Sequence, residues 1–260
     1  MKKLLAMAMA ILMVFSCFAG CNANTDQTDS EYVKDKGKLV VGITDYAPMD
    51  YKDENGQWTG FDAEFATLFA KELGVEIEFF VIADWGKKVY ELDSKNIDCI
   101  WNGMTINDEL KSLTNCSDPY VVNAQVVVMK ADKVGNYTDA ESLKGLTVAV
   151  EGGSTGETAA KEAGITDLIA TDDMAKALLE VKAGTADACV IDITMAKAMT
   201  GEGTDYADLA IAVTLNAEQY GVGFRKDSDL TKMFNEFKAK LMANGTLQEL
   251  AKKYNLTLVE

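Results

Sequence analysis

The side chains that most often do chemistry in enzymes are scarce in this sequence. None of its 260 residues is a histidine, which excludes serine-histidine-aspartate triads, zinc sites that use histidine and haem-histidine ligation. Arg225 is the only arginine, so a single side chain could bind a carboxylate or phosphate through a planar fork of donors. Any binding chemistry must therefore rest mainly on other groups.

A glycine-rich segment supplies one such group. Residues 152–156 read Gly-Gly-Ser-Thr-Gly and lie between a predicted strand and a predicted helix. Free backbone N–H groups at the start of a helix can bind an anion. Ser154 and Thr155 are therefore candidate ligand-binding residues, and the alternative is that Ser154 only caps the helix.

The charge balance and the cysteines exclude other classes of function. With 25 basic and 41 acidic residues the net charge is −16, which opposes binding to nucleic acid, so we expect no nucleic-acid partner. Cys99, Cys116 and Cys189 have no Cys-x-x-Cys spacing, so we expect buried thiols, no metal and no cofactor. A disulfide between Cys99 and Cys116 stays open.

The N-terminal region predicts export. Two lysines precede an apolar run at residues 4–19, and small residues precede Cys21, so residues 1–20 are predicted to be a signal peptide. Residues 18–21 (Phe-Ala-Gly-Cys) resemble the lipobox of bacterial lipoproteins, which makes Cys21 the expected lipidation site. The protein would then lie on the extracytoplasmic face of the bacterial cell membrane, while plain secretion or cleavage near Cys17 is the alternative. Residues 21–37 are polar without an apolar period and predict a flexible, lipid-anchored tether.

Beyond the tether, short apolar strands alternate with amphipathic helices. This order predicts an α/β fold with a sheet rich in parallel strands and covered on both faces. The expected strands are residues 38–43, 76–81, 98–101, 124–130, 146–150, 188–191 and 220–224. The expected helices are residues 62–73, 87–95, 154–163, 174–183, a segment ending at 199, 230–243 and 246–254.

The pattern restarts after about residue 124, which predicts two lobes. The C-terminal helices are too few for a third unit, so we assign them to the first lobe. Lobe 1 then comprises residues 38–127 and 222–260, and lobe 2 comprises residues 128–221, with two crossover strands between them. A ligand site is expected in the cleft between the lobes.

Several segments, in this order, resemble the family-3 extracellular solute-binding proteins, the polar amino-acid receptors of bacterial ABC importers. They are residues 53–62 (DENGQWTGFD), 97–106 with Asn-Gly-Met-Thr-Ile at its end, 117–120 (SDPY) and 220–226 (YGVGFRK). The ordered resemblance runs from about residue 38 to 254. It implies a type II periplasmic-binding-protein-like fold whose lobes close on a small solute and present it to permease subunits in the membrane.

The resemblance also assigns roles to individual residues. Tyr46 and Trp85 stand where relatives place aromatic walls, although either ring could instead pack in the core. Gly103 would offer a carbonyl to an ammonium group, and Thr105 would offer its N–H and hydroxyl to a carboxylate. Asp192 matches the aspartate that pairs with the α-ammonium of a ligand, with a helix cap as the alternative.

One position departs from the family pattern. Residues 103–105 resemble the family's ligand loop, which ends in a threonine. Five residues after that threonine, relatives carry the arginine that binds the α-carboxylate, and this chain has Leu110 there. By resemblance, Arg225 lies beyond the return strand and away from the cleft. Either Thr105 and residues 153–156 bind a carboxylate without arginine, or the ligand has none.

Whether or not the ligand has a carboxylate, acidic residues near the expected cleft favour a cationic or amine-bearing ligand. The alternative is that these acids only form part of the solvated surface. They are Asp45, Asp50, Glu151 and Asp192. We therefore expect a monomeric substrate-binding subunit of an ABC importer that captures an amino acid or related amine. The alternatives are a sensor that partners a membrane receptor and, on the same fold, a dehydratase-like enzyme. No catalytic residue is assigned.

Overall fold

A computed structural model describes residues 27–260 of the chain, so the predicted signal peptide and Cys21 lie outside the described residues. Its helices and strands, in chain order, are α2 (Asp29–Lys36), β1 (Lys38–Ile43), β2 (Tyr51–Lys52), β3 (Trp58–Thr59), α3 (Phe61–Leu73), β4 (Glu76–Val81), η1 (Trp85–Lys87), α4 (Lys88–Asp93), β5 (Cys99–Thr105), α5 (Asp108–Leu113), β6 (Asn115–Cys116), β7 (Val121–Lys130), η2 (Val134–Asn136), η3 (Glu141–Leu143), β8 (Thr147–Glu151), α6 (Thr155–Glu162), β9 (Asp167–Thr171), α7 (Met174–Ala183), β10 (Ala188–Asp192), α8 (Ile193–Met199), β11 (Leu209–Phe224), α9 (Leu230–Ala243) and α10 (Thr246–Lys253).

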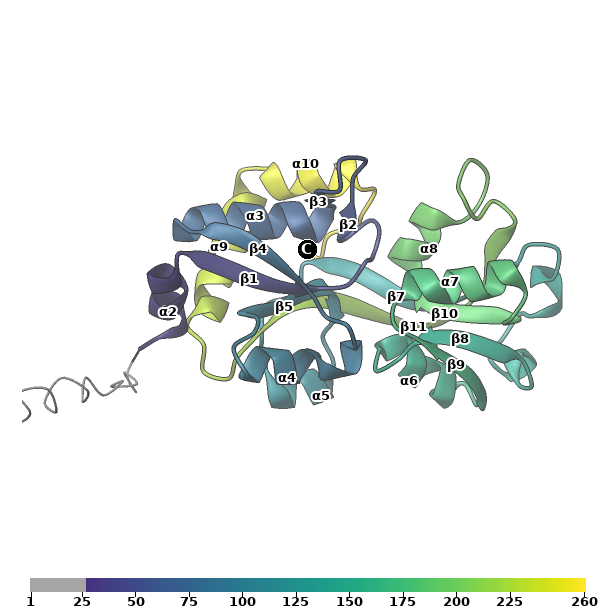
Figure 1. Ribbon diagram of the computed structural model, residues 1–260. Helices are drawn as coiled ribbons and strands as arrows, with labels where there is room; N and C mark the ends of the chain where they lie inside the picture. Colours follow the sequence, from purple (N-terminus) through teal and green to yellow (C-terminus); the bar gives the residue numbers. More distant parts are fainter. Residues whose placement is uncertain (1–26) are drawn as a thin grey trace, which may run out of the picture.

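Two long strands join the two halves of the molecule (Figure 1). The main sheet has the order β4-β1-β5-β11-β7-β10-β8-β9, with β6 also paired to β11. The strands β4, β1 and β5 are parallel to one another, and so are β10, β8 and β9. Between these groups β7 and β11 run antiparallel, β11 pairing with β5 on one side and β7 with β10 on the other. The fold is thus mixed α/β with β7 and β11 as the connecting strands.

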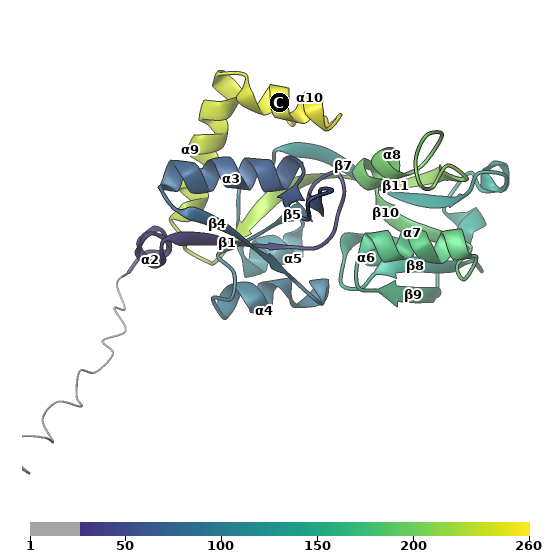
Figure 2. The same ribbon diagram turned by 45° about the horizontal axis from the view of Figure 1, so that its top comes forward.

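Helices cover both faces of the sheet in each half. In Figures 1 and 2, α3 and α10 lie on one side of β1 and β4, and α4 and α5 lie on the other. The inner face of α3 packs into an aromatic cluster formed by Phe65, Phe69, Trp101, Phe234 and Phe237. Burying such side chains contributes roughly 1.5–3 kcal/mol each, so this cluster stabilises the packing of α3 and α9 on the sheet. Helix α3 ends at Gly74, whose positive φ of 77° suits only glycine comfortably.

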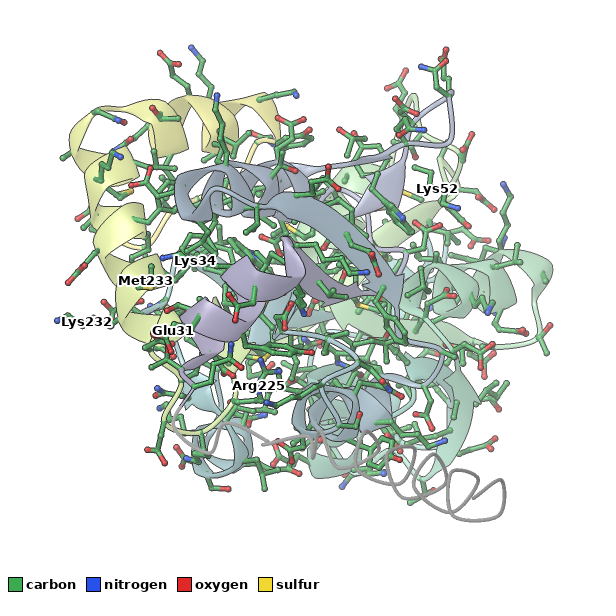
Figure 3. All side chains as sticks on the ribbon, turned by 60° about the vertical axis from the view of Figure 1, so that its left-hand side comes forward. Glu31, Lys34, Lys52, Arg225, Lys232 and Met233 are labelled. Atoms are coloured by element: carbon green, nitrogen blue, oxygen red, sulfur yellow. The ribbon has the colours of Figure 1, made fainter. Side chains whose placement is uncertain are left out.

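The predicted flexible tether is wrong for residues 29–36, which form α2 and dock on lobe 1. Thr28 caps this helix through a reciprocal capping box with Glu31, and Gly37 ends it in the left-handed conformation. Ser30 donates from its backbone N–H and its hydroxyl to Asp229 at the start of α9, at 3.0 and 2.6 Å. Figure 3 shows Glu31 and Lys34 on this helix and Arg225 on the same side of the molecule.

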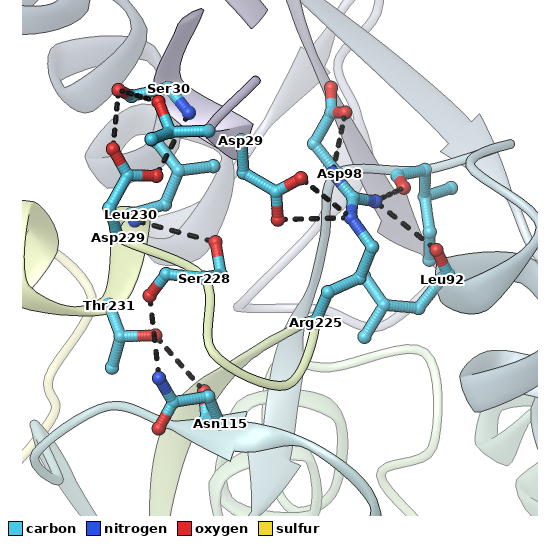
Figure 4. A network of polar contacts seen from close by, with 12 residues as sticks. Asp29, Ser30, Leu92, Asp98, Asn115, Arg225, Ser228, Asp229, Leu230 and Thr231 are labelled. Carbon is cyan, nitrogen blue, oxygen red and sulfur yellow. Dashed lines mark hydrogen bonds and ion pairs between the residues drawn. The ribbon is translucent and has the colours of Figure 1, made fainter. Parts of the chain in front are cut away.

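Arg225 is the centre of the contact between α2 and lobe 1 (Figure 4). Its Nε donates to both carboxylate oxygens of Asp29 at 3.0 Å, and its Nη1 donates to the backbone carbonyls of Leu92 and Ile97. Its Nη2 lies 3.4 Å from Asp98, a fully buried carboxylate that also binds Lys36. The only arginine of the chain is therefore committed to structure, far from the predicted ligand loop.

Two further findings concern the described residues as a whole. Cys99, Cys116 and Cys189 are all free thiols, so the open disulfide between Cys99 and Cys116 is not formed. Within residues 27–260, no helix combines the length and the apolar character that crossing a membrane requires.

Candidate ligand-binding site

A cavity of about 270 Å³ lies between the lobes, at the ends of β5, β8 and β10. Its walls come from η1, α4, β5 and α5 on one side and from β8, α6 and β10 on the other, with Gln125 of β7 also in the lining. Six residues that the sequence predicted for ligand binding are among those that line it: Trp85, Gly103, Thr105, Ser154, Thr155 and Asp192. The folding of the chain thus brings together residues more than 100 positions apart.

Tyr46 is not part of this lining. It is fully buried, and its hydroxyl shares hydrogen bonds with the hydroxyls of Thr194 and Tyr220. A Cβ atom on Gly103 would approach the Tyr46 ring to 2.5 Å, so the ring lies directly against the backbone of the ligand loop. The position fits the core-packing alternative for Tyr46, and among the described residues Trp85 is the aromatic side chain that lines the cavity.

The ligand loop is held by a buried carboxylate. Asp62, in the first turn of α3, accepts the Gly103 N–H at 2.6 Å and the Tyr120 hydroxyl at 2.8 Å. Gly103 itself has a positive φ of 57°, a conformation that a β-branched residue would not adopt without strain. These contacts fix the end of β5 and hence the positions of Asn102 and Thr105.

Three oxygen acceptors that line the cavity have no hydrogen-bond partner among the described residues. They are Asn102 Oδ1, Gln125 Oε1 and Glu151 Oε1, and each atom is buried. Leaving such a group unsatisfied costs about 1–3 kcal/mol. The cavity is therefore complementary to a ligand that carries several N–H donors.

Glu151 and Asp192 are the two most buried acids that line the cavity, and only 4% of the surface of Asp192 is exposed. Its Oδ1 accepts from the amide of Asn123 at 2.9 Å and from the amide of Gln125. Burial, reinforced by Glu218, raises the pKa of Asp192 to about 7. Its side chain makes no capping hydrogen bond to α8, so the alternative role as a helix cap finds no support.

Glu151 lies on the same side of the cavity, at the end of β8. Burial, followed by repulsion from Asp192, raises the pKa of Glu151 to about 8. Glu109 and Glu157 also line the cavity, whereas Asp45 and Asp50 do not. Of the four acidic residues expected near the cleft, the structure thus brings Glu151 and Asp192 together and leaves the other two outside.

The start of α6 presents unused donors to the cavity. Ser154 Oγ accepts the Glu157 N–H at 3.1 Å, so Ser154 caps the helix as well as lining the cavity. The Gly153 N–H is bound by the Glu157 carboxylate at 2.7 Å. No hydrogen bond from the N–H of Thr155 or Gly156 to any described residue is present, as expected at the first positions of a helix.

Leu110 forms part of an apolar patch on the lobe 1 side of the cavity. It lies in α5, is 6% exposed and packs in a cluster with Trp85 and Met104. The next residue, Lys111, is exposed. At the position where the sequence resemblance places an arginine, the cavity therefore has no donor.

Comparison with known proteins decides the family. The description "Bacterial extracellular solute-binding proteins, family 3" matches residues 39–257. The chain belongs to this family. It is 33% identical over 260 residues to the arginine-binding extracellular protein ArtP of Bacillus subtilis (strain 168), covering 98% of each chain. It is also 33% identical over 229 residues to the L-cystine-binding protein TcyJ of Escherichia coli (strain K12), covering 85% of this chain and 84% of TcyJ.

The solved structures of the family show the same fold. The P235GK mutant of ArgBP from T. maritima is 35% identical and superposes with a TM-score of 0.81, over 87% of this chain and 98% of that one. ArtP and TcyJ are both named as binding proteins, ArtP for arginine and TcyJ for L-cystine. The two-lobed fold and the family are thereby established.

Sequence reasoning missed a polar network beneath the cavity of this family member. Glu218 of β11 accepts from the Thr105 hydroxyl at 2.7 Å and from the amides of Asn123 and Gln125 at 2.5 and 2.8 Å. Asn123 and Gln125 stand two positions apart in an otherwise apolar strand, and that alternation was the available signal. Lys88 and Asn102 were missed as well, because nothing in their spacing marks them as cavity residues.

Proposed function

We propose that the chain is the extracytoplasmic, lipid-anchored substrate-binding subunit of an ABC importer, and that it captures an amino acid or related amine as its lobes close. The observation that carries the proposal is the set of buried oxygen acceptors without partners around Asp192. An ammonium group has three N–H donors and one positive charge, which match both features.

The two walls give the ligand an orientation. Asp192, Glu151 and the side-chain oxygens of Asn102 and Gln125 would bind ammonium or guanidinium groups. The Trp85 ring would pack against the apolar or flat part of the ligand. A ligand that touches both lobes stabilises the closed arrangement only through its higher affinity for that arrangement.

Contacts between the lobes support closure. Lys88 Nζ in lobe 1 donates to the Gly153 carbonyl in lobe 2 at 3.1 Å. Gly86 and Gly153 pack backbone to backbone, since a Cβ on Gly153 would lie 2.5 Å from the Gly86 Cα. These contacts lie beside the cavity, so ligand contacts and lobe contacts form together.

A thermal-shift screen of amino acids and amines, followed by calorimetric titration, tests the proposal. We expect at least one amino acid or amine to raise the melting temperature and to bind without being consumed. Binding with consumption would favour the dehydratase-like alternative, for which Glu151 and Asp192 have pKa values near neutrality. Absence of any stabilisation across the screen would contradict the proposal. A permease or a receptor that binds the loaded protein would separate transport from sensing.

A further inference from the structure

The lysine that joins the two lobes also brings a positive charge to the cavity. Among residues 27–260, Lys88 is the only lysine or arginine that lines it. Lys88 is the first residue of α4 and is 9% exposed, whereas the preceding Lys87 is exposed and pairs with Asp84 at 3.1 Å. A buried ammonium group in a ligand cavity is costly unless something compensates its charge.

The protein compensates Lys88 only in part. Its Nζ donates to the carbonyls of Trp85 and Gly153 at 3.2 and 3.1 Å, and it lies 5.0 Å from the centre of the Trp85 ring. Two of its three donors are thus used. No carboxylate oxygen of the described residues comes within 4.0 Å of Nζ, so Lys88 has no direct ion pair. One N–H and the formal charge remain for another partner.

The nearest donors point to what that partner is. Lys88 binds the carbonyl of Gly153, which directly precedes the start of α6. There the N–H groups of Thr155 and Gly156 line the same cavity and make no hydrogen bond to a described residue. A lysine ammonium and the positive end of a helix together favour a carboxylate. Leu110, in the wall that also carries Lys88, contributes no donor.

We propose that Lys88 and the first turn of α6 bind the carboxylate of an amino-acid ligand, replacing the arginine that is absent at Leu110. This inference rests on the proposed function and narrows it, because a ligand held at both ends must be an amino acid rather than a simple amine. Specificity then has two parts, with the acids and amide oxygens around Asp192 selecting the amino end and Lys88 selecting the carboxylate.

Pairs of amino acids and their decarboxylated counterparts test the inference. Calorimetric titrations would compare arginine with agmatine, lysine with cadaverine, histidine with histamine and cystine with cystamine. For the amino acid that binds best, we expect the wild type to bind it at least tenfold more tightly than its amine. Lys88→Met should lower the affinity for the amino acid at least tenfold and change the affinity for the amine less than threefold. Lys88→Arg should retain the preference, and Lys87→Met, as a matched control, should change neither affinity.

Other outcomes would overturn the inference without touching the proposed function. If Lys88→Met weakens both members of a pair equally, Lys88 only shapes the cavity. If Lys88→Met raises the affinity for both members of a pair, Lys88 only offsets the charge of Glu151 and Glu109. An unchanged preference in Lys88→Met would also contradict the role. Binding of none of the four amino acids by the wild type would overturn this inference, whereas the proposed function is decided by the wider thermal-shift screen. A melting curve of each variant without ligand would show that it folds.

Discussion

At the scale of single residues, the site is defined by acids that burial keeps partly protonated. Glu151 and Asp192 have raised pKa values because burial disfavours their charged forms. A cationic group placed beside them would favour the ionised form and expel the proton. Ligand binding and protonation are therefore coupled in this account.

The first prediction concerns Asp192. Asp192→Asn keeps the shape of the side chain but removes its charge, so the affinity for a ligand with an ammonium group should fall by at least tenfold. The melting temperature without ligand should not fall, because the variant buries no charge. Calorimetric titration and thermal unfolding measure the two effects. Asp132→Asn, at an exposed site, is the matched control, and an unchanged affinity in Asp192→Asn would show that the ammonium lies elsewhere.

The second prediction concerns the pH dependence of stability. The pKa of Glu151 is about 8 in the folded protein against an ordinary value of 4.5, so the folded state holds its proton over that window. Protons bound more tightly in the folded state make the free energy of unfolding fall as pH rises. Between the two pKa values, each unit of rising pH lowers the free energy of unfolding by about 1.4 kcal/mol for one such group.

Urea unfolding between pH 5 and 8 would measure this dependence. We expect the free energy of unfolding without ligand to fall over this range, and Glu151→Gln to reduce that fall. The affinity for a cationic amino acid should rise over the same range, because its binding releases protons. A stability that increases from pH 5 to pH 8 in the wild type and the variant alike would contradict the protonation of Glu151.

The residue scale also shows how much of the site the sequence could reveal. Sequence reasoning could select Trp85, Gly103, Thr105 and Asp192, all of which line the cavity, because each occupies a position that resembles a ligand-binding position of the family. Lys88 was not selected, since a lysine at the start of a helix is ordinarily solvated, whereas here it contacts Trp85 and Gly153 and is buried. Tyr46 was predicted as a wall, yet its hydroxyl finds partners inside the protein, at Thr194 and Tyr220.

At the scale of elements, periodic segments were predicted well and interrupted ones poorly. The predicted bounds of α7, α9 and β4 agree with the structure, because each has a regular apolar period and clear stop residues. β11 begins at Leu209, well before the predicted residue 220, and bulges in its pairing with β7 break the alternation that marks a strand. β9 is an edge strand with few buried residues and was missed altogether.

The element α2 was missed for a different reason. Its composition is polar and its amphipathicity is weak, so the sequence gives no sign of a buried face. In the structure, Ser30 and Val33 are its buried residues. The helix is held by capping and by polar contacts with residues about 200 positions away, at Arg225 and Asp229. Contacts of that kind cannot be read from local sequence.

The third prediction tests those contacts. Arg225→Met removes the partner of Asp29 and part of the compensation of the buried Asp98, so it should lower the free energy of unfolding by about 3 kcal/mol. Ligand affinity should be almost unchanged, because Arg225 does not line the cavity. Chemical unfolding measures the loss, with the exposed Lys232→Met as the control. A stability loss no larger than that of the control would show that α2 is not anchored by Arg225.

The fourth prediction concerns the contact between η1 and the start of α6. In Gly153→Ala the new Cβ would meet the Gly86 Cα at 2.5 Å, and the positive φ of 71° adds strain, so the lobes should be held apart. We expect the affinity for the best amino acid to fall at least tenfold. Gly86→Ala is the matched control, because its Cβ would lie 3.8 Å from the Gly153 Cα. Equal affinities in the two variants would show that the contact between Gly86 and Gly153 does not contribute to closure.

At the scale of the whole molecule, β7 and β11 are the feature that permits movement. β11 pairs with β5 of the first parallel group, β7 pairs with β10 of the second, and the two strands pair with each other, so a rotation of the lobes would act through them. The cavity lies beside these strands, and Gln125 of β7 contributes to its lining. Under the proposed closure, a ligand bound at this position would act directly on the angle between the lobes.

Small-angle X-ray scattering with and without a saturating amino acid tests this account most directly. The amino acid would be the one that gives the largest thermal shift, and Asp192→Asn under the same conditions would serve as the control. We predict a smaller radius of gyration for the wild type with the amino acid and no change for Asp192→Asn. A wild-type radius that stays the same when the amino acid is bound would contradict capture by closure of the two lobes.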